Sequence, residues 1–206
     1  MIVRDVAETI SVVSENFSTP KTIFVMGSST GSLGVIKLAW SDLRAKYPQL
    51  KKVTAGFMVN AACPDSFLGK WDRATPIYAL NGKDDDSTPA LACKTLASSG
   101  SLPGFKSLTY PGAHHFESPE YGPTEVVDGM HIIPTCSINY TNELHTQIKR
   151  RDGADGWDTK KKGFGDPLYK WLGKTCVRKG HLQGYHKQGS DMMWGDINKI
   201  IVFGNL

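Results

Sequence analysis

Short apolar runs alternate along the chain with stretches in which apolar residues recur every three or four positions. The runs are rich in β-branched and aromatic residues and are bounded by turn residues, a pattern that predicts buried strands. Because segments with helical spacing lie between the runs, the chain is predicted to be an α/β protein with a mostly parallel sheet flanked by helices. The expected strands are residues 22–26, 53–59, 75–80 and 105–110.

The helical spacing predicts four helices around these strands. Asp5 is the expected N-cap of the first helix. Ser87 or Thr88 is the expected N-cap of the third helix, which would place Pro89 in its first turn. Gly195 weakens the pattern of the last helix. The expected helices cover residues 6–17, 33–48, 89–97 and 192–203.

One motif lies at the point where the first strand is predicted to turn into a helix. After residues 22–26 comes Gly27-Ser28-Ser29-Thr30-Gly31, a G-x-S-x-G sequence. The order of strand, tight turn and helix is typical of a nucleophile elbow, in which the serine hydroxyl stands above the sheet. The flanking glycines permit a sharp turn, and a helix N-terminus directs free N–H groups at a developing oxyanion. Ser29 is therefore the candidate nucleophile.

A serine nucleophile needs a general base, and the base needs an acid that orients it. These residues are expected just past strand ends, in the chain order Ser, Asp, His. The strand 75–80 precedes an acidic turn at residues 84–86, and the strand 105–110 precedes a turn with His114 and His115. Alone, an acidic cluster is commonly a solvated helix cap and such a histidine a surface residue. Three such segments, each past a strand end and in the chain order Ser, Asp, His, indicate a catalytic triad instead.

These segments carry a resemblance to a known family. Residues 76–97, PIYALNGKDDDSTPALACKTLA, and residues 110–116, YPGAHHF, resemble the acid and histidine turns of the α/β-hydrolase fold and, within it, of the dienelactone hydrolase family. The resemblance covers about residues 22–116 and continues more faintly through KTCVRKGHLQGY. In the family the acid lies three residues after the glycine and the base is the second histidine, which implies Asp85 and His115.

The resemblance implies acyl transfer with a Ser29, Asp85 and His115 triad. The backbone N–H of Thr30 would supply half of the oxyanion hole, and neither a metal nor an organic cofactor is expected. Members of the family proper use a cysteine nucleophile, whereas this chain has serine, as esterase-like relatives do. That departure favours general ester hydrolysis over a lactone substrate, so the expected partner is a small ester or lactone.

The N-terminal region is short for this fold. An α/β-hydrolase places four strands and a helix before its elbow strand, whereas here about twenty residues precede it, which is the expectation for an N-terminally incomplete hydrolase. The elbow strand would then be an exposed apolar sheet edge, which favours a homo-oligomer through that edge. The second hydrogen-bond donor of the oxyanion hole would also be missing. Removal of one such donor from a serine protease lowers its kcat about 100- to 1000-fold.

Composition fits one domain over residues 1–206. The 40% hydrophobic content supports a core, and a net charge of +4 demands no anionic partner, so no nucleic acid is expected. No apolar stretch approaches the roughly 18 residues of a membrane span. The first residues lack the plan of a signal peptide, which predicts a cytoplasmic protein; a truncated N-terminus and paired cysteines would instead fit a periplasmic or secreted one.

Four cysteines leave two alternatives open. Cys63 and Cys93 are similar to cysteines of relatives in the family, and the fold implied by the resemblance brings their regions together. Cys136 and Cys176 bracket a long insertion and would staple it. The alternative is four reduced, partly buried thiols. The spacing of these residues does not indicate zinc.

The insertion, at about residues 117–189, is expected to be rich in loops. It carries basic residues and aromatics that fit either a rim over the active site or a solvent-exposed surface loop. Its aspartates offset the basic charge that a nucleic-acid-binding surface would need.

Two other functions remain open beside an esterase. One is an impaired hydrolase that acts as a binding module, and the other is a serine peptidase or thioesterase with the same triad.

Overall fold

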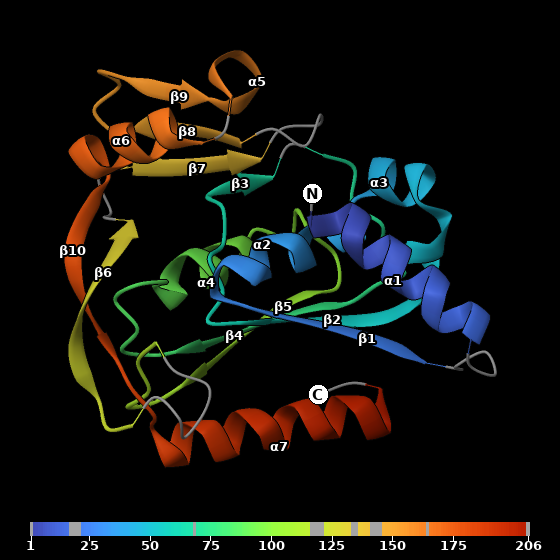
Figure 1. Cartoon of the computed structure of the whole chain (residues 1–206). Coiled ribbons are helices and arrows are strands. Elements are labelled where there is room, and N and C mark those ends of the chain that lie inside the picture. Colours follow the sequence, from blue (N-terminus) through green and yellow to red (C-terminus); the bar gives the residue numbers. More distant parts are fainter. Residues whose placement is uncertain are drawn as a thin grey trace.

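The centre of the protein is a sheet of four parallel strands in the order β1–β2–β4–β5 (Figure 1). The computed structural model describes residues 2–16, 22–67, 69–115, 122–132, 136–140, 146–163 and 165–204. The predicted α/β class with a mostly parallel sheet is confirmed. Two predicted strands coincide with the observed ones, and the other two lie one or two residues further along. The strands are β1 (Ile23–Ser28), β2 (Val53–Val59), β4 (Ile77–Gly82) and β5 (Phe105–Tyr110).

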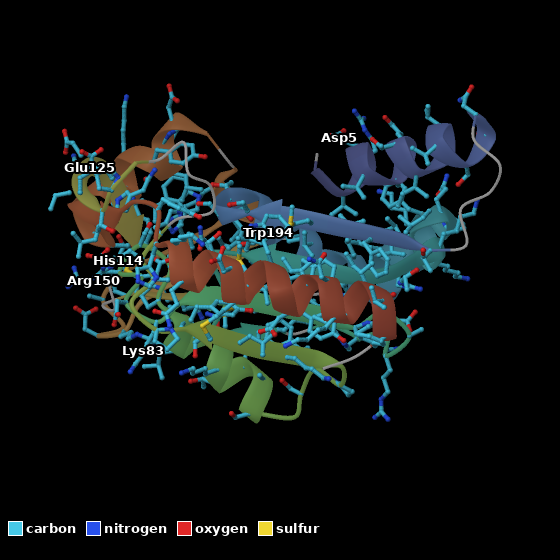
Figure 2. All side chains as sticks on the ribbon, turned by 90° about the horizontal axis from the view of Figure 1, so that it is seen from below. Asp5, Lys83, His114, Glu125, Arg150 and Trp194 are labelled. Atoms are coloured by element: carbon cyan, nitrogen blue, oxygen red, sulfur yellow. A yellow bond between two sulfur atoms is a disulfide. The ribbon has the colours of Figure 1, made fainter. Side chains whose placement is uncertain are left out.

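Helices cover both faces of this sheet because its strands are apolar on both sides. Along β2, Met58 packs into the core beneath α1 (Ile2–Asn16) and α4 (Ala90–Ser98). Its neighbour Phe57 packs into the core beneath α7 (Lys187–Phe203). This alternation is the two-residue period of a strand. Figure 2 views the molecule from the α7 side and shows this helix lying across the sheet.

The prediction of one continuous helix over residues 33–48 is wrong. It is divided into short pieces because Trp40 adopts an extended conformation, with φ −80° and ψ 120°, and forms a bridge with Trp71. Trp40 is fully buried, so its burial overrides the helical pattern. The pieces are η1 (Ser29–Gly31), α2 (Ser32–Val35), η2 (Ile36–Ala39), α3 (Ser41–Lys46) and η3 (Pro48–Lys52).

Both predicted helix caps are wrong, while the helices themselves are confirmed. α1 begins at Ile2, so Asp5 lies inside its first turn, and Phe17 lies outside the described residues. The N-cap of α4 is Pro89, and no side chain caps that helix. The expected final helix begins earlier, at Lys187, and Gly195 does not interrupt it.

The insertion expected to be rich in loops holds regular structure in its described residues. Strand β7 pairs with β8 and with β3, and β8 pairs with β9, so this lobe has its own small sheet. Buried Ile148 and Leu168 contribute to a separate apolar core. The elements are β3 (Ser66–Phe67), β7 (Cys136–Tyr140), β8 (Thr146–Arg150), β9 (Gly156–Asp158), α5 (Thr159–Lys162) and α6 (Asp166–Thr175).

An antiparallel ribbon joins this lobe to the parallel sheet. It consists of β6 (Glu125–Ile132) and β10 (Val177–Gln183), and Figure 1 shows it running past the carboxyl ends of the sheet strands. A disulfide between Cys136 and Cys176 joins the start of β7 to the residue before β10. The disulfide therefore joins the two ends of the chain segment between these cysteines and makes that segment a covalently closed loop.

The second disulfide joins Cys63 to Cys93 and ties the loop after β2 to α4. Both pairings are those considered from the sequence, and reduced thiols are not observed.

None of the helices in the described part of the chain combines the length and apolarity that a membrane span requires. Among the described residues, β1 pairs only with β2, so its other side is a sheet edge, and Met26 on this strand is 52% exposed. Formation of a homo-oligomer through this edge stays a prediction.

Candidate active site

The G-x-S-x-G motif forms a tight turn at the carboxyl end of β1. Ser29 has φ +48°, a left-handed conformation that non-glycine residues rarely adopt. A Cβ at Gly27 would lie 2.5 Å from the carbonyl oxygen of Gly31, so the turn requires glycine at position 27. Gly31 has φ −62° and open space where a Cβ would be, so the prediction that both glycines serve the turn holds only for Gly27.

A buried serine fixes the turn to the loop that follows the neighbouring strand. Ser32 Oγ donates to the carbonyl oxygen of Ser29 at 2.6 Å and accepts from the backbone N–H of Ala62 at 3.1 Å. Ala62 lies in the loop that follows β2. The strained Ser29 is therefore held by a hydrogen bond within its own turn, and Ser32, the donor of that bond, is joined to the loop after β2, as a persistent left-handed residue requires.

The acidic turn after β4 directs one carboxylate inward. Asp85 Oδ1 accepts the backbone N–H groups of Ser87 and Thr88, both at 2.8 Å. These are the two residues expected to cap α4, and their N–H groups are instead used to fix the Asp85 side chain. Thr88 Oγ1 donates to Asp85 Oδ2 at 2.7 Å. Buried Asn81 donates its amide to the carbonyl oxygens of Ala61 and Thr88, which holds the turn against the neighbouring loop.

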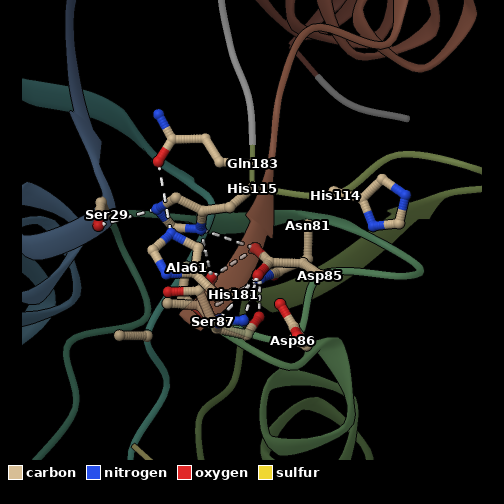
Figure 3. Close-up of polar contacts among 12 residues, drawn as sticks. Ser29, Ala61, Asn81, Asp85, Asp86, Ser87, His114, His115, His181 and Gln183 are labelled. Carbon is tan, nitrogen blue, oxygen red and sulfur yellow. Dashed lines mark hydrogen bonds and ion pairs between the residues drawn. The ribbon is translucent and has the colours of Figure 1, made fainter. Parts of the chain in front are cut away.

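His115 connects this carboxylate to the serine. Its Nδ1 lies 3.0 Å from Asp85 Oδ2, and its Nε2 lies 3.1 Å from Ser29 Oγ (Figure 3). A carboxylate only accepts hydrogen bonds, so Nδ1 carries the hydrogen and Nε2 is left to accept from the serine hydroxyl. The structure thus brings together the three side chains predicted as a triad, from the ends of β1, β4 and β5.

The local electrostatics keep Asp85 ionised. Burial alone would raise the pKa of this carboxyl group, because desolvation disfavours the charged form. The hydrogen bond and charge of His115, together with the hydrogen bonds from Thr88, outweigh that effect and hold the Asp85 pKa below its ordinary value. A carboxylate in this state can stabilise a positively charged His115.

The two other aspartates of the turn bind backbone rather than the imidazole. Asp84 Oδ2 accepts the N–H of Gly112, which lies in the histidine turn, at 3.1 Å. Asp86 Oδ1 accepts the N–H of Leu182 on β10 at 3.0 Å. His114 Nδ1 lies 2.9 Å from the carbonyl oxygen of Asp84, and Figure 3 shows its ring on the side away from Ser29. Of the aspartates and histidines in these two turns, Asp85 and His115 are therefore the pair whose side chains contact each other, and their catalytic roles stay a proposal.

Two polar residues of the insertion lie at the site without having been predicted. His181 is 8% exposed, and its ring meets that of His115 edge to face, with 5.7 Å between ring centroids. Gln183 Oε1 lies 3.4 Å from His181 Nε2. Both residues lie in the segment KTCVRKGHLQGY, to which the resemblance extends only faintly, and nothing in that segment assigns either of them a role at the site. Thr88 was predicted only as a cap.

The remaining expectations concern groups other than the three side chains. Thr30 directly follows Ser29 in η1 and is exposed, and its N–H as an oxyanion donor stays a prediction. Within the described ranges no group of three or more His, Cys, Asp or Glu residues is arranged to hold a metal ion.

No protein-family model matches the chain, and no curated protein sequence matches it. Among solved structures, one similar chain is esterase 2 of Thermogutta terrifontis phosphorylated by paraoxon, with 17% identity and a TM-score of 0.38 over 55% of this chain and 52% of that one. Another is a thermostable esterase, with 18% identity and a TM-score of 0.33 over 54% of this chain and 28% of that one. The chain thus matches about half of the first structure (52%) and less of the second.

Proposed function

We propose that the chain is a serine hydrolase of carboxylic esters with the α/β-hydrolase type of site. The observation that carries this proposal is the continuous hydrogen-bonded series from Asp85 through His115 to Ser29, with contacts of 3.0 and 3.1 Å. The strained conformation of Ser29 at the end of a parallel strand supports the same assignment. The resemblance of the acid and histidine turns to dienelactone hydrolases adds lactones as a related substrate class.

The proposed reaction proceeds through an acyl-enzyme. Ser29 Oγ attacks the ester carbonyl while its proton passes to His115 Nε2, and Asp85 stabilises the resulting imidazolium. The Thr30 N–H donates to the developing oxyanion. When the tetrahedral intermediate collapses, the carbon–oxygen bond to the alcohol breaks and His115 protonates the leaving alcohol. Water then attacks the acyl group by the same steps, giving the carboxylic acid and free Ser29.

The test is hydrolysis of p-nitrophenyl acetate by the protein and by its Ser29→Ala variant, both shown to be folded by circular dichroism. We expect activity that disappears in the variant and that is fastest on short-chain esters when longer esters, a thioester and an aminoacyl anilide are compared. A clear preference for the anilide would indicate a peptidase. Equal background rates from two folded proteins would contradict the enzyme assignment and favour a binding module.

A further inference from the structure

The last strand of the insertion returns to the histidine turn and pairs with it. The N–H of His115 donates to the carbonyl oxygen of Leu182 at 3.4 Å, and the N–H of Gly184 donates to the carbonyl oxygen of His115 at 3.3 Å. These contacts form an isolated parallel bridge between His115 and Gln183. Leu182 also donates to Asp86 of the acidic turn. β10 therefore contacts the turns that carry both Asp85 and His115.

The same strand places one imidazole against another. The planes of His115 and His181 are inclined at 86°, which is the edge-to-face arrangement that planar aromatic rings favour at this separation. Gln183 Oε1 can only accept a hydrogen bond, so His181 Nε2 is the donor in the 3.4 Å contact. Gln183 thereby restrains the ring of His181, and His181 in turn lies against His115.

The hydrogen bonds of His115 depend on the orientation of its ring. Nδ1 contacts Asp85 and Thr88, and Nε2 contacts Ser29, so rotation about the Cα–Cβ and Cβ–Cγ bonds changes these contacts. Such a rotation moves Nε2 relative to Ser29 Oγ and weakens proton transfer. A ring packed edge to face against His115 opposes this motion. His181 occupies that position.

We propose that His181, restrained by Gln183, is a positioning residue that holds the imidazole of His115 in line with Ser29 and Asp85. This role rests on the proposed function of the triad. It assigns the insertion a part in the site, because the strand that carries His181 leaves the disulfide-closed lobe and ends at the histidine turn. His181 acts through His115, by the shape of its ring.

The activity test compares His181→Ala with His181→Phe on p-nitrophenyl acetate. His181→Ala removes the ring, and we expect kcat to fall about 10- to 100-fold with KM within about twofold, since misplacement of a catalytic group acts on the chemical step. His181→Phe keeps an edge-to-face ring and is expected to restore kcat to within about threefold of the parent. A kcat within twofold for His181→Ala overturns the proposal. A rise in KM at unchanged kcat also overturns it, because it indicates contact with substrate.

A spectroscopic measurement separates this proposal from the function itself. The Nδ1–H proton of His115 is expected as a downfield proton NMR signal, assigned by its loss in His115→Gln. The signal should persist in His181→Phe and disappear or broaden in His181→Ala. If the parent protein is folded but hydrolyses no ester, the proposed function fails, and this NMR comparison still decides the positioning role. An unchanged signal in folded His181→Ala overturns it.

A second variant covers the case in which His181→Ala does not fold. Gln183→Leu keeps a side chain of similar size but removes the acceptor for His181 Nε2. We expect a kcat roughly three- to tenfold lower and a broadened Nδ1–H signal, the loss expected for one hydrogen bond. Thermal unfolding of each variant checks that the fold is retained. Parent-like kcat and an unchanged signal in Gln183→Leu contradict the proposal.

Discussion

At the scale of single residues, Ser29 combines a strained backbone with the candidate nucleophile. Its φ of +48° costs a non-glycine residue about 1–3 kcal/mol, and the hydrogen bonds of Ser32 across the turn help to maintain it. Glycine adopts the same conformation without that cost. The geometry needed to expose the hydroxyl is therefore in conflict with the stability of the turn.

This conflict predicts different stabilities for two inactive variants. Ser29→Gly relieves the left-handed strain, whereas Ser29→Ala keeps it, so Ser29→Gly should have a free energy of unfolding about 1 kcal/mol higher than Ser29→Ala. Guanidinium denaturation of both variants measures the difference. Both lack the hydroxyl, so the comparison isolates the backbone. A Ser29→Ala variant as stable as Ser29→Gly would show that Ser29 is unstrained.

A second residue-scale prediction follows from the lowered pKa of Asp85. A carboxyl group whose pKa is lower in the folded state stabilises the fold above its unfolded-state pKa, near 4, and loses that contribution as the pH falls through its folded-state pKa. The difference in unfolding free energy between the parent and Asp85→Asn should therefore be largest near neutral pH and shrink in acid. Denaturation at a series of pH values measures it, with exposed Asp42→Asn as control. A pH-independent difference would contradict the assignment.

At the scale of elements, the turn between β1 and α2 depends on one glycine of its motif. Gly27→Ala would place a Cβ 2.5 Å from a backbone oxygen, which forces the turn to move, whereas Gly31→Ala meets no atom within 4 Å. We expect Gly27→Ala to lower ester hydrolysis at least about 100-fold, since a shift of roughly 1 Å at the nucleophile has an effect of that size. Gly31→Ala should stay within about threefold of the parent.

The same assay and the unfolding midpoint of each variant check this pair. Equal activity of Gly27→Ala and the parent would show that the turn tolerates a side chain at position 27. A large loss in Gly31→Ala would show that the open space beside it is needed by the substrate. The two outcomes are distinct because only one of the glycines faces backbone.

At the scale of the whole molecule, two disulfides join segments that are distant in sequence. They close loops with sequence separations of 30 and 40 residues, so their contributions in the chain-entropy model are nearly equal. Replacement of either pair by alanine should lower the free energy of unfolding by about 2–5 kcal/mol. Guanidinium denaturation with and without reductant measures the loss. Identical unfolding curves for the parent and for either double variant would contradict this expectation.

Much of the central fold and the candidate triad could be predicted from the sequence because both rest on local patterns. The strands of the parallel sheet are buried apolar runs, and Ser29, Asp85 and His115 each follow such a run. The rest depends on tertiary contacts that local patterns do not contain. The buried Trp40 divides a helix, and Asp85 takes the N–H groups of the expected caps. The contact of His181 with His115 requires the insertion to return to the site.

The most direct test of the account is covalent labelling of the protein by a fluorophosphonate, followed by mass spectrometry of its peptides. The account predicts one adduct, located on Ser29, that is absent from Ser29→Ala and forms at least about 100-fold more slowly in His115→Ala, because the hydroxyl then lacks its general base. Circular dichroism of each protein confirms that it is folded. A folded parent protein that gains no adduct, or gains it on another residue, would contradict the account.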